Sequence, residues 1–305
     1  MRLAIDIGAR FVDMVAWGAG AVRHCKEPVG ADLIRSVRAG LATLDVAPAQ
    51  VSEVRIASSG FLNHLLHAGT VRHGPKVGLI ATAGLEDVAA LGRQDRIGLF
   101  DPVARVATPM HLIDDAAIFG VSARMDARGR ELAPVDPADI DRIAEALRAR
   151  GTSAVAICLL HAHVDGRHED AVATALSVRV PQVSISLSHR VDPQPREFER
   201  TVSTVVDAWL RLTVLPELAE LEGRFAADGF SGRWAWGDGR GILSDTGASL
   251  VPWITAGPAA SIRGTAALAD VACGDAIAID IGSRSSDLAL VRSGTPATID
   301  GGILA

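Results

Sequence analysis

Two short stretches, one near each end of the 305-residue chain, share one alternation of apolar and polar positions. Residues 6–13 have the sequence DIGARFVD, and residues 280–287 have the sequence DIGSRSSD. Each stretch follows an apolar run and leads directly into another. An apolar run, a short glycine-containing turn and a second apolar run predict a β-hairpin with an aspartate at the end of its first strand. Two such hairpins suggest two related half-domains.

Between the predicted hairpins, strand patterns alternate with helix patterns, which is typical of a parallel α/β sheet. The longest helical stretch, residues 195–228, contains Pro216, which should kink it or divide it in two. Strands are predicted at residues 21–27, 54–57, 76–82, 154–160, 183–187 and 234–236, and helices at 32–44, around 62–66, at 84–91, from 137 onward and from 256 onward.

The pattern loosens between about residues 92 and 134, where charged residues and prolines gather but apolar residues persist. This segment is interpreted as an inserted excursion with a few short strands. The chain is longer than a usual single domain, so two lobes are predicted. Residues 1–190 would form the first lobe, including the excursion, and residues 191–305 a partial second lobe with the long helix and the second hairpin.

Composition and charge argue against several classes of function. A net charge of −6 and scattered arginines argue against a nucleic-acid partner, which would need a basic face. The three cysteines at positions 25, 158 and 273 are far apart, which argues against a disulfide framework and favours a reducing cytoplasm. There is no run of about 18 uncharged apolar residues, so no membrane association is expected.

The densest group of potential metal ligands is His161, His163, Asp165, His168 and Glu169, predicted in a loop between a strand and a helix. The three histidines could hold a zinc or manganese ion. Alternatively, these side chains make hydrogen bonds at the end of a helix.

The paired hairpins resemble those of the actin, sugar-kinase and Hsp70 class of phosphotransferases. In that class the turns contact the phosphates of ATP through backbone N–H groups, and the strand-end aspartates orient the metal and the attacking water. Such turns usually have the sequence Asp-x-Gly-Gly-Thr. Here Ala9 and Ser283 occupy the second glycine position, and Arg10 and Arg284 occupy the threonine position.

Several further motifs together resemble the large ATP-using subunit of the hydantoinase/oxoprolinase family, which includes subunits of acetone and acetophenone carboxylases. The resemblance runs from residue 1 to about 296 and implies a two-lobed, actin-like and ribonuclease-H-like α/β ATPase fold. The second lobe would be truncated, since family members continue well beyond this point. The motifs are GLEDV at 84–88, GRQDR at 92–96, CLLH at 158–161, SLSH at 186–189, REFERTVSTVVDA at 196–208 and GPAA at 257–260.

The resemblance implies a phosphate site at the two hairpin turns and the start of the last helix. A third family turn, Asp-Gly-Gly, is replaced by residues 238–240, DGR. Because a bulky cation near aspartates tends to pair with them, we expect each arginine to fill its own turn, leaving vestigial phosphate loops and no bound cofactor. The residues concerned are Asp6, Gly8, Arg10, Asp13, Gly257, Asp280, Gly282, Arg284 and Asp287.

The leading hypothesis is a small, divergent subunit of a multi-subunit ATP-dependent ketone carboxylase, similar to acetophenone carboxylase. It would be mainly structural, have no catalytic residues, and dock on larger subunits that include a full-length ATP-binding member of the family. The alternative is a Mg-ATP half-site completed by a partner chain in a hydantoinase-type amidohydrolase or a carboxylase, with the arginines as phosphate ligands. A third hypothesis is a regulatory module that binds a small anion.

Overall fold

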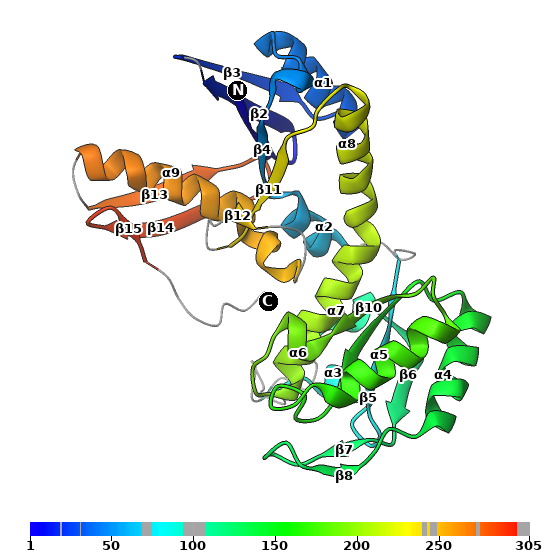
Figure 1. Ribbon diagram of the computed structural model, residues 1–305. Coiled ribbons are helices and arrows are strands. Elements are labelled where there is room, and N and C mark those ends of the chain that lie inside the picture. The colour runs from blue at the N-terminus through cyan, green and yellow to red at the C-terminus, as the bar shows by residue number, and fades with distance from the viewer. Residues whose placement is uncertain are drawn as a thin grey trace. The chain divides into compact units, whose positions relative to one another are not determined.

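The computed structural model describes residues 1–18, 20–30, 32–68, 75–93, 100, 108–239, 243–244, 249–272 and 275–297. The motif residues 94–96, Arg240 and Cys273 lie outside this part of the chain. The chain divides into two compact units, one formed by Met1–His67 with Glu217–Ala305 and the other by Ala68–Pro216 (Figure 1). The fold is α/β, as predicted, but this division differs from the expected boundary near residue 190.

The first unit is built on a six-stranded mixed sheet with the order β12-β11-β4-β1-β2-β3. Strands β1, β2 and β3 form an antiparallel meander, which confirms the first predicted hairpin and the strand after it. Strand β4 pairs with β1 in parallel, and β11 pairs with β4 in parallel. The strands are β1 (Arg2–Ile7), β2 (Phe11–Gly18), β3 (Ala21–Pro28), β4 (Glu53–Ser58), β11 (Arg233–Gly237) and β12 (Leu243–Ser244).

Helix α1 (Leu33–Leu44) packs on β3 and β2. It begins after Asp32, whose side chain accepts hydrogen bonds from two backbone N–H groups of the first turn. Gly40 lies so close to β2 that a Cβ there would be 2.3 Å from the Sδ atom of Met14. Because side chains alternate between the faces of a strand, every second residue of β1 and β2 is buried on this side. These residues are Leu3, Ile5, Ile7, Val12, Met14 and Ala16.

The chain returns to this sheet through β11, and that pairing explains why the units are not contiguous in sequence. Trp236 of β11 stacks between Trp234 and Trp253, with ring centroids 6.1 and 5.1 Å away. Since β11 adds next to β4, the C-terminal segment joins the N-terminal sheet. The other helices of this unit are η1 (Pro48–Gln50), α2 (Gly60–Ala68), α8 (Leu215–Ala227), η3 (Val251–Thr255) and α9 (Ala256–Ala272).

The second predicted hairpin is confirmed as β13 (Ala276–Ile281) and β14 (Ser286–Arg292), followed by the short β15 (Thr295–Pro296). Asp280 lies opposite Asp287, as Asp6 lies opposite Asp13 in the first hairpin. Helix α9 packs against one face of this small sheet. The two hairpins are therefore equivalent position by position.

The second unit is a four-stranded parallel sheet with the order β10-β9-β5-β6. Every residue of β5 and β9 is buried, as the continuous apolar runs predict. The sheet strands are β5 (Val77–Thr82), β6 (Ile113–Val121), β9 (Ala154–Cys158) and β10 (Ser184–Leu187), and a two-stranded ribbon consists of β7 (Arg124–Met125) and β8 (Glu131–Ala133).

Helices α4 and α5 share a hydrophobic core with this sheet, whereas α7 packs on β9, β10 and β5. The helical stretch around Pro216 is divided, as predicted, because proline has no N–H to continue the hydrogen-bond ladder. The helices are α3 (Val88–Leu91), η2 (Pro109–Leu112), α4 (Pro137–Arg150), α5 (Arg167–Arg179), α6 (Ser188–Val191) and α7 (Glu197–Thr213).

The structure differs from two interpretations that were based on the sequence. The supposed excursion at 92–134 supplies β6, a nine-residue strand of the sheet, as well as the β7–β8 ribbon. Helix α7, expected as the spine of the second lobe, belongs to the second compact unit. The loosened pattern concealed β6 because its burial does not alternate regularly along its length. No helix in the described part of the chain is long and apolar enough to span a membrane.

The equivalence of the hairpins predicts unequal effects of the same substitution. Ile5→Ala should lower the free energy of unfolding by about 2–5 kcal/mol, because Ile5 is 1 % exposed and its truncation leaves a cavity. Ile279→Ala, at the matching position, should cost less than about 1 kcal/mol, because Ile279 is 59 % exposed. Urea unfolding of both variants measures the difference. Equal losses would contradict the assigned burial.

Candidate functional site

The two hairpin turns have the same backbone geometry. The N–H of Gly8 donates to the carbonyl oxygen of Phe11 at 2.9 Å, and the N–H of Gly282 donates to that of Ser285 at 2.9 Å. A Cβ at Gly8 would be 3.0 Å from the Phe11 oxygen, and one at Gly282 would be 3.1 Å from the Ser285 oxygen. Glycine therefore gives each turn its close backbone approach.

Among the described residues, the backbone N–H groups at the centre of both turns have no protein acceptor. In the described part of the chain, neither Ala9 nor Arg10 donates a backbone hydrogen bond, and the same holds for Ser283 and Arg284. Such paired N–H groups at a turn can bind an anion. Although a larger residue replaces the second glycine of each predicted phosphate loop, the backbone N–H donors of that loop are still available to an anion.

The two arginines do not fill their turns, contrary to expectation. Arg10 and Arg284 are exposed, and neither forms an ion pair with a carboxylate among the described residues. Instead, Lys26 of β3 reaches Asp13, with an Nζ–Oδ2 distance of 2.7 Å. The strand register places Lys26 directly opposite Asp13, so the lysine side chain reaches this carboxylate more directly than Arg10 does from the tip of the turn.

The strand-end aspartates form a group with excess negative charge. The pKa of the Asp6 carboxyl is raised from 3.8 to about 6 by loss of hydration and by the charges of Asp13 and Asp280, against the opposing effect of Lys26. Asp6 still has an exposed edge, so water screens part of these effects. Burial and Asp280 likewise raise the pKa of Asp287. One lysine does not neutralise this group.

The start of α9 lies beside the end of β4. A Cβ at Gly257 would be 2.7 Å from the backbone nitrogen of Ser59, so only glycine permits this approach. Ser58 in turn donates its hydroxyl proton to the carbonyl oxygen of Ile7 at 2.9 Å. The structure therefore places Gly257 against the end of β4, whose Ser58 contacts the last residue of β1. Asp238 of the third turn is buried.

Sequence reasoning missed Lys26 and Ser58. Lys26 could have been found from the strand pattern, since a third antiparallel strand must place one of its residues opposite Asp13. Ser58 could not, because its contact depends on the parallel pairing of β1 with β4, two strands far apart in sequence.

The donor types of this group suit Mg²⁺, which commonly binds one or two carboxylates together with phosphate oxygens and water. Among the described residues, no three His, Cys, Asp or Glu side chains are already arranged to hold a metal ion. The aspartates would therefore supply only part of a coordination shell, and a bound phosphate would have to supply the rest.

The predicted histidine metal site receives no support from the structure. The rings of His161 and His163 have centroids 6.2 Å apart, whereas Nε2 of the buried His168 lies 3.7 Å from Glu131. Partial burial and the nearby Arg200 guanidinium lower the pKa of His163. A fixed cation beside His163, 3.2 Å from Nδ1, also disfavours a second cation there.

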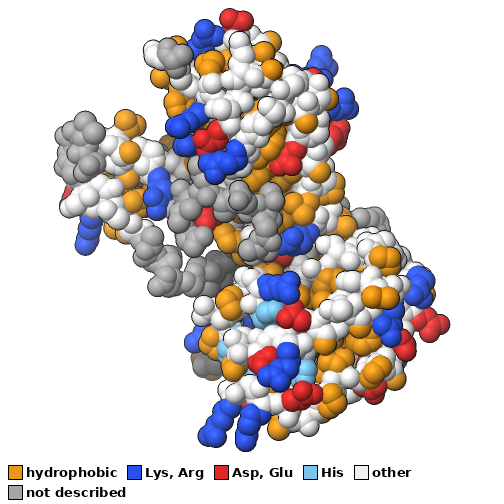
Figure 2. All heavy atoms as spheres, in the orientation of Figure 1, with side chains coloured by type: hydrophobic (Ala, Val, Ile, Leu, Met, Phe, Trp, Pro, Cys, Tyr) orange, Lys and Arg blue, Asp and Glu red, His pale blue; other side chains and the backbone are white. Residues whose placement is uncertain are grey.

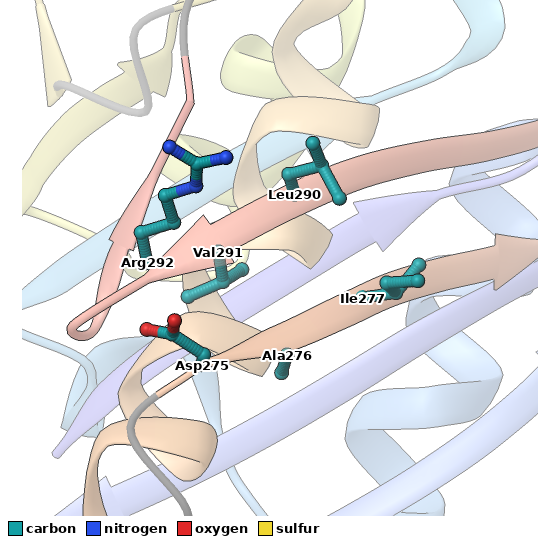
Figure 3. A pocket seen from close by; sticks show the side chains of 6 residues that line it. All are labelled: Asp275, Ala276, Ile277, Leu290, Val291 and Arg292. Atoms are coloured by element: carbon teal, nitrogen blue, oxygen red, sulfur yellow. The ribbon is translucent and has the colours of Figure 1, made fainter.

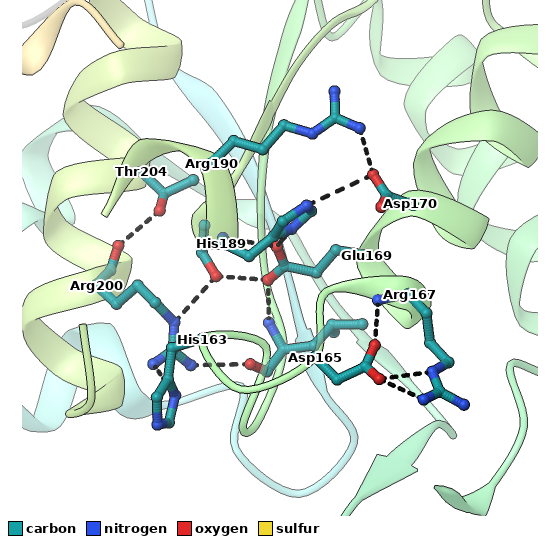
Figure 4. A network of polar contacts seen from close by, with 11 residues as sticks. His163, Asp165, Arg167, Glu169, Asp170, His189, Arg190, Arg200 and Thr204 are labelled. Atoms are coloured by element: carbon teal, nitrogen blue, oxygen red, sulfur yellow. Dashed lines mark hydrogen bonds and ion pairs between the residues drawn. The ribbon is translucent and has the colours of Figure 1, made fainter. Parts of the chain in front are cut away.

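The neighbouring Glu169 instead belongs to a buried polar network (Figure 4). Its carboxylate accepts hydrogen bonds from the backbone N–H groups of Leu159 and His189, at 2.8 and 3.0 Å, and from the Ser188 hydroxyl at 2.5 Å. Its Oε2 atom also lies 2.7 Å from Nδ1 of His189. These contacts fasten α5 to the loops after β9 and β10, so Glu169 has the helix-end role considered as the alternative.

Arg200 of α7 completes this network from the opposite side. Its buried guanidinium donates to the Ser188 hydroxyl at 3.0 Å, to the carbonyl oxygen of Leu159 at 2.9 Å and to that of Gln194 at 3.0 Å. Ser188 therefore links the buried charges of Glu169 and Arg200.

On the face of the molecule shown in Figure 2, basic side chains are interspersed with acidic ones.

Comparison with protein families gives two adjacent matches. The model of the hydantoinase/oxoprolinase N-terminal region matches residues 2–180, and the hydantoinase/oxoprolinase model matches residues 200–303. The acetophenone carboxylase gamma subunit of Aromatoleum aromaticum is 28% identical over 312 residues, which cover 94% of this chain and 42% of that protein.

Two solved structures have a similar fold. Nucleotide-free acetone carboxylase matches with a TM-score of 0.80 at 24% identity, covering 96% of this chain and 44% of that chain. The ATP-dependent caprolactamase of Pseudomonas jessenii matches with a TM-score of 0.78 at 26% identity, covering 95% and 43%. These matches confirm the predicted actin-like, ribonuclease-H-like α/β class. The chain spans less than half the length of these relatives.

The aspartate group predicts a pH dependence. In metal-free buffer, Asp6 should titrate with a midpoint near pH 6, visible by carboxyl 13C NMR. Because its folded pKa exceeds the usual 3.8, the folded state binds the extra proton, and stability should fall as pH rises from about 4 to about 6. Asp280→Asn should lower the midpoint, Lys26→Met should raise it, and the distant Arg128→Met should leave it unchanged. A midpoint near 4 would contradict the assignment.

The buried network predicts a stability effect. Arg200→Met should cost about 3–5 kcal/mol, because it removes the buried guanidinium that donates to Ser188, Leu159 and Gln194. In a double-mutant cycle, Arg200→Met combined with Glu169→Gln should cost less than the two single changes together. As control, Arg224→Met removes an exposed ion pair with Glu220 and should cost less than about 1 kcal/mol. Strict additivity of the first pair would refute the coupling.

Proposed function

This chain belongs to the hydantoinase/oxoprolinase family, and from that premise we propose that it is a subunit of a multi-subunit, ATP-dependent enzyme. Its two hairpins would form half of a Mg²⁺–nucleotide site. The remaining half would supply the adenosine contacts. A carboxylase similar to acetophenone carboxylase is the favoured setting, because that relative is named as one subunit of its enzyme.

The observation that carries this proposal is the unneutralised group of Asp6, Asp13 and Asp280 beside turns with unused N–H donors. Backbone N–H groups would hold phosphate oxygens, and the aspartates would hold the hydrated cation. Bound Mg²⁺ would neutralise the negative charge of the phosphates. The chain's own contribution is to position the phosphates and to keep Asp6 and Asp280 directed toward the same ion.

The exposed guanidinium groups of Arg10 and Arg284 fit this role. An arginine can donate two parallel hydrogen bonds to a phosphate, which are stronger than those of a neutral hydroxyl. Since neither arginine has a carboxylate partner in the described part of the chain, neither must break an ion pair to bind. They would therefore replace the threonine hydroxyls of related turns.

A mainly structural subunit without nucleotide is the second candidate. It is favoured by the side chains at Ala9 and Ser283, where related turns have glycine and allow a closer approach of phosphate. In either case the expected partners are larger subunits, including a full-length ATP-binding member of the family. We also propose a cytoplasmic location, since the described cysteines, Cys25 and Cys158, are free thiols.

Nucleotide binding tests the proposal. Titration calorimetry with ADP, ATP and Mg²⁺ should be performed on the complex co-purified with the tagged chain. Arg10→Ala or Arg284→Ala should weaken binding roughly tenfold or more, because each removes a charge-assisted hydrogen bond. Asp6→Asn should abolish the dependence on Mg²⁺. The matched control Arg128→Ala removes an exposed arginine of the second unit and should have no effect.

If the full-length partner also binds nucleotide, single-site variants of this chain separate the two sites. Unchanged affinity and stoichiometry in all three variants would reject the half-site and support the structural subunit.

A further inference from the structure

The parallel sheet of the second unit has a topological switch point between β5 and β9. From β5 the chain runs to β6 by way of α3 and η2, which pack on α7, whereas from β9 it runs to β10 by way of α5, on the other face of the sheet. The loops after these two neighbouring strands therefore lead to opposite faces. In open parallel sheets, ligands bind beside the carboxyl ends of the strands at such a point.

Polar groups gather at the carboxyl ends of these two strands. The backbone N–H of Leu160, just after β9, donates to the hydroxyl of Thr82 at the end of β5 at 2.9 Å, which joins the two loops. His161 and His163 follow in the same loop, with half-buried rings whose centroids lie 6.2 Å apart. The backbone of His161 has a φ of 59°, a left-handed conformation that is uncommon for residues other than glycine and that clusters at functional sites.

Arg200 fixes the hydrogen-bonding role of His163. Its Nη1 atom lies 3.2 Å from Nδ1 of His163, and a guanidinium can only donate, so Nδ1 must accept. The neutral imidazole therefore has its proton on Nε2. Figure 4 shows the His163 ring beside Arg200, on the side away from Glu169. His163 is thus held as a hydrogen-bond donor at the border of the buried network.

The donor of His163 is available, whereas those of Arg200 are in use. Apart from the contact with Arg200, neither histidine ring has a hydrogen-bond partner in the part of the chain that the structure describes. The guanidinium already donates to the Ser188 hydroxyl and to the carbonyl oxygens of Leu159 and Gln194. Its charge can therefore act on a ligand only through His163, by polarising the Nε2–H group.

The charges around the two rings indicate the class of ligand. Arg200 lowers the pKa of His163 more than Glu197 raises it, so the potential at the ring is positive and favours an anion. The carboxylate of Glu197 nevertheless lies 3.6 Å from Arg200, which disfavours a second negative charge on the ligand. Each neutral imidazole offers one N–H, and two such donors suit a planar group with two acceptor oxygens.

We propose that His163 and His161 bind a small monocarboxylate at the carboxyl ends of β5 and β9. The Nε2–H of His163 donates to one carboxylate oxygen, and the N–H of His161 donates to the other. Arg200 is a positioning residue, because it acts through His163. The inference goes beyond the proposed function and is independent of it, since this site requires neither nucleotide nor Mg²⁺.

The second hairpin has the hollow that offers an alternative location for a small ligand. It has a volume of about 300 Å³, and Figure 3 shows Asp275 and Arg292 at one side of it and Ile277 and Leu290 at the other. The charge of Asp275 offsets that of Arg292, so this hollow does not favour an anion. Arg292 is therefore a suitable control position.

Nuclear magnetic resonance of the full chain with 15N-labelled histidines tests the proposal, at constant ionic strength and about pH 7.5. Without ligand, long-range 15N–1H spectra should show His163 as the neutral Nε2–H tautomer. Sodium acetate should shift the His161 and His163 signals and saturate them with a Kd of about 1–10 mM. Inorganic phosphate has a second negative charge and acetamide has none, so neither should shift them.

Three results of these spectra would overturn the proposal. The first is a His163 ring that is protonated or has its proton on Nδ1. The second is a shift that does not saturate by about 50 mM acetate. The third is an equal response to phosphate or to acetamide.

Substitutions locate the site. His163→Phe and His161→Gly should each weaken acetate binding at the remaining ring roughly tenfold or more, because each removes a hydrogen bond to a charged group. Glycine adopts the left-handed conformation of residue 161 without strain, so this variant should fold even if the other does not. Circular dichroism verifies folding, and the signals missing in each variant assign the spectra.

Two matched controls complete the series. His111→Phe removes an exposed histidine of the same unit, and Arg292→Met removes the cation at the hollow of the second hairpin. Both should leave the acetate affinity unchanged. Affinity retained in folded His161→Gly or His163→Phe, or lost in Arg292→Met, would reject the histidine site whatever the nucleotide calorimetry finds.

Discussion

The structure depends on one constraint: an apolar face of a β-hairpin must be covered. In the first hairpin this face is buried, with α1 packed on β2 and β3, and β4 and β11 extend the sheet beside β1. The second hairpin has the same register and the same apolar period, yet only its α9 side is covered. Burial of large aliphatic side chains contributes about 1.5–3 kcal/mol each, so the five exposed ones, Ile277, Ile279, Ile281, Leu288 and Leu290, represent much unused stabilisation.

The charges at the two turns matter as well as the space that the side chains occupy. Arginine at the tip of a turn extends into solvent, whereas the strand-end aspartates remain close to one another. Lys26 pairs with Asp13 and offsets only part of the repulsion, so loss of hydration and the charges of Asp13 and Asp280 raise the pKa of Asp6. Carboxylates held together without sufficient cations lower stability unless a ligand brings positive charge. The aspartates therefore have the charge that a hydrated cation would complement, and the exposed arginines have the charge that a phosphate would complement.

The second unit has a different construction. Its parallel sheet has strands buried along their whole length, and its loops are joined by the network of Glu169, Ser188 and Arg200. Buried charges are tolerated there because each has several hydrogen-bond partners. The histidines that suggested a metal belong to the surroundings of this network. Residue types that bind metals thus serve here to fix loop positions.

The sequence alone determined the two hairpins, most helices and the family, because these depend on local periodicity and on motifs in a fixed order. It also placed Asp6, Asp13, Asp280 and Asp287 at equivalent strand ends. Tertiary structure decided what no local pattern contains. The pairing of β11 with β4 set the boundary of the units. The register of β3 made Lys26, and not Arg10, the ion-pair partner of Asp13. The packing of α9 on one face of the second hairpin left Ile279, on the other face, exposed. Each of these joins elements distant in sequence, so only the folded chain brings their atoms together.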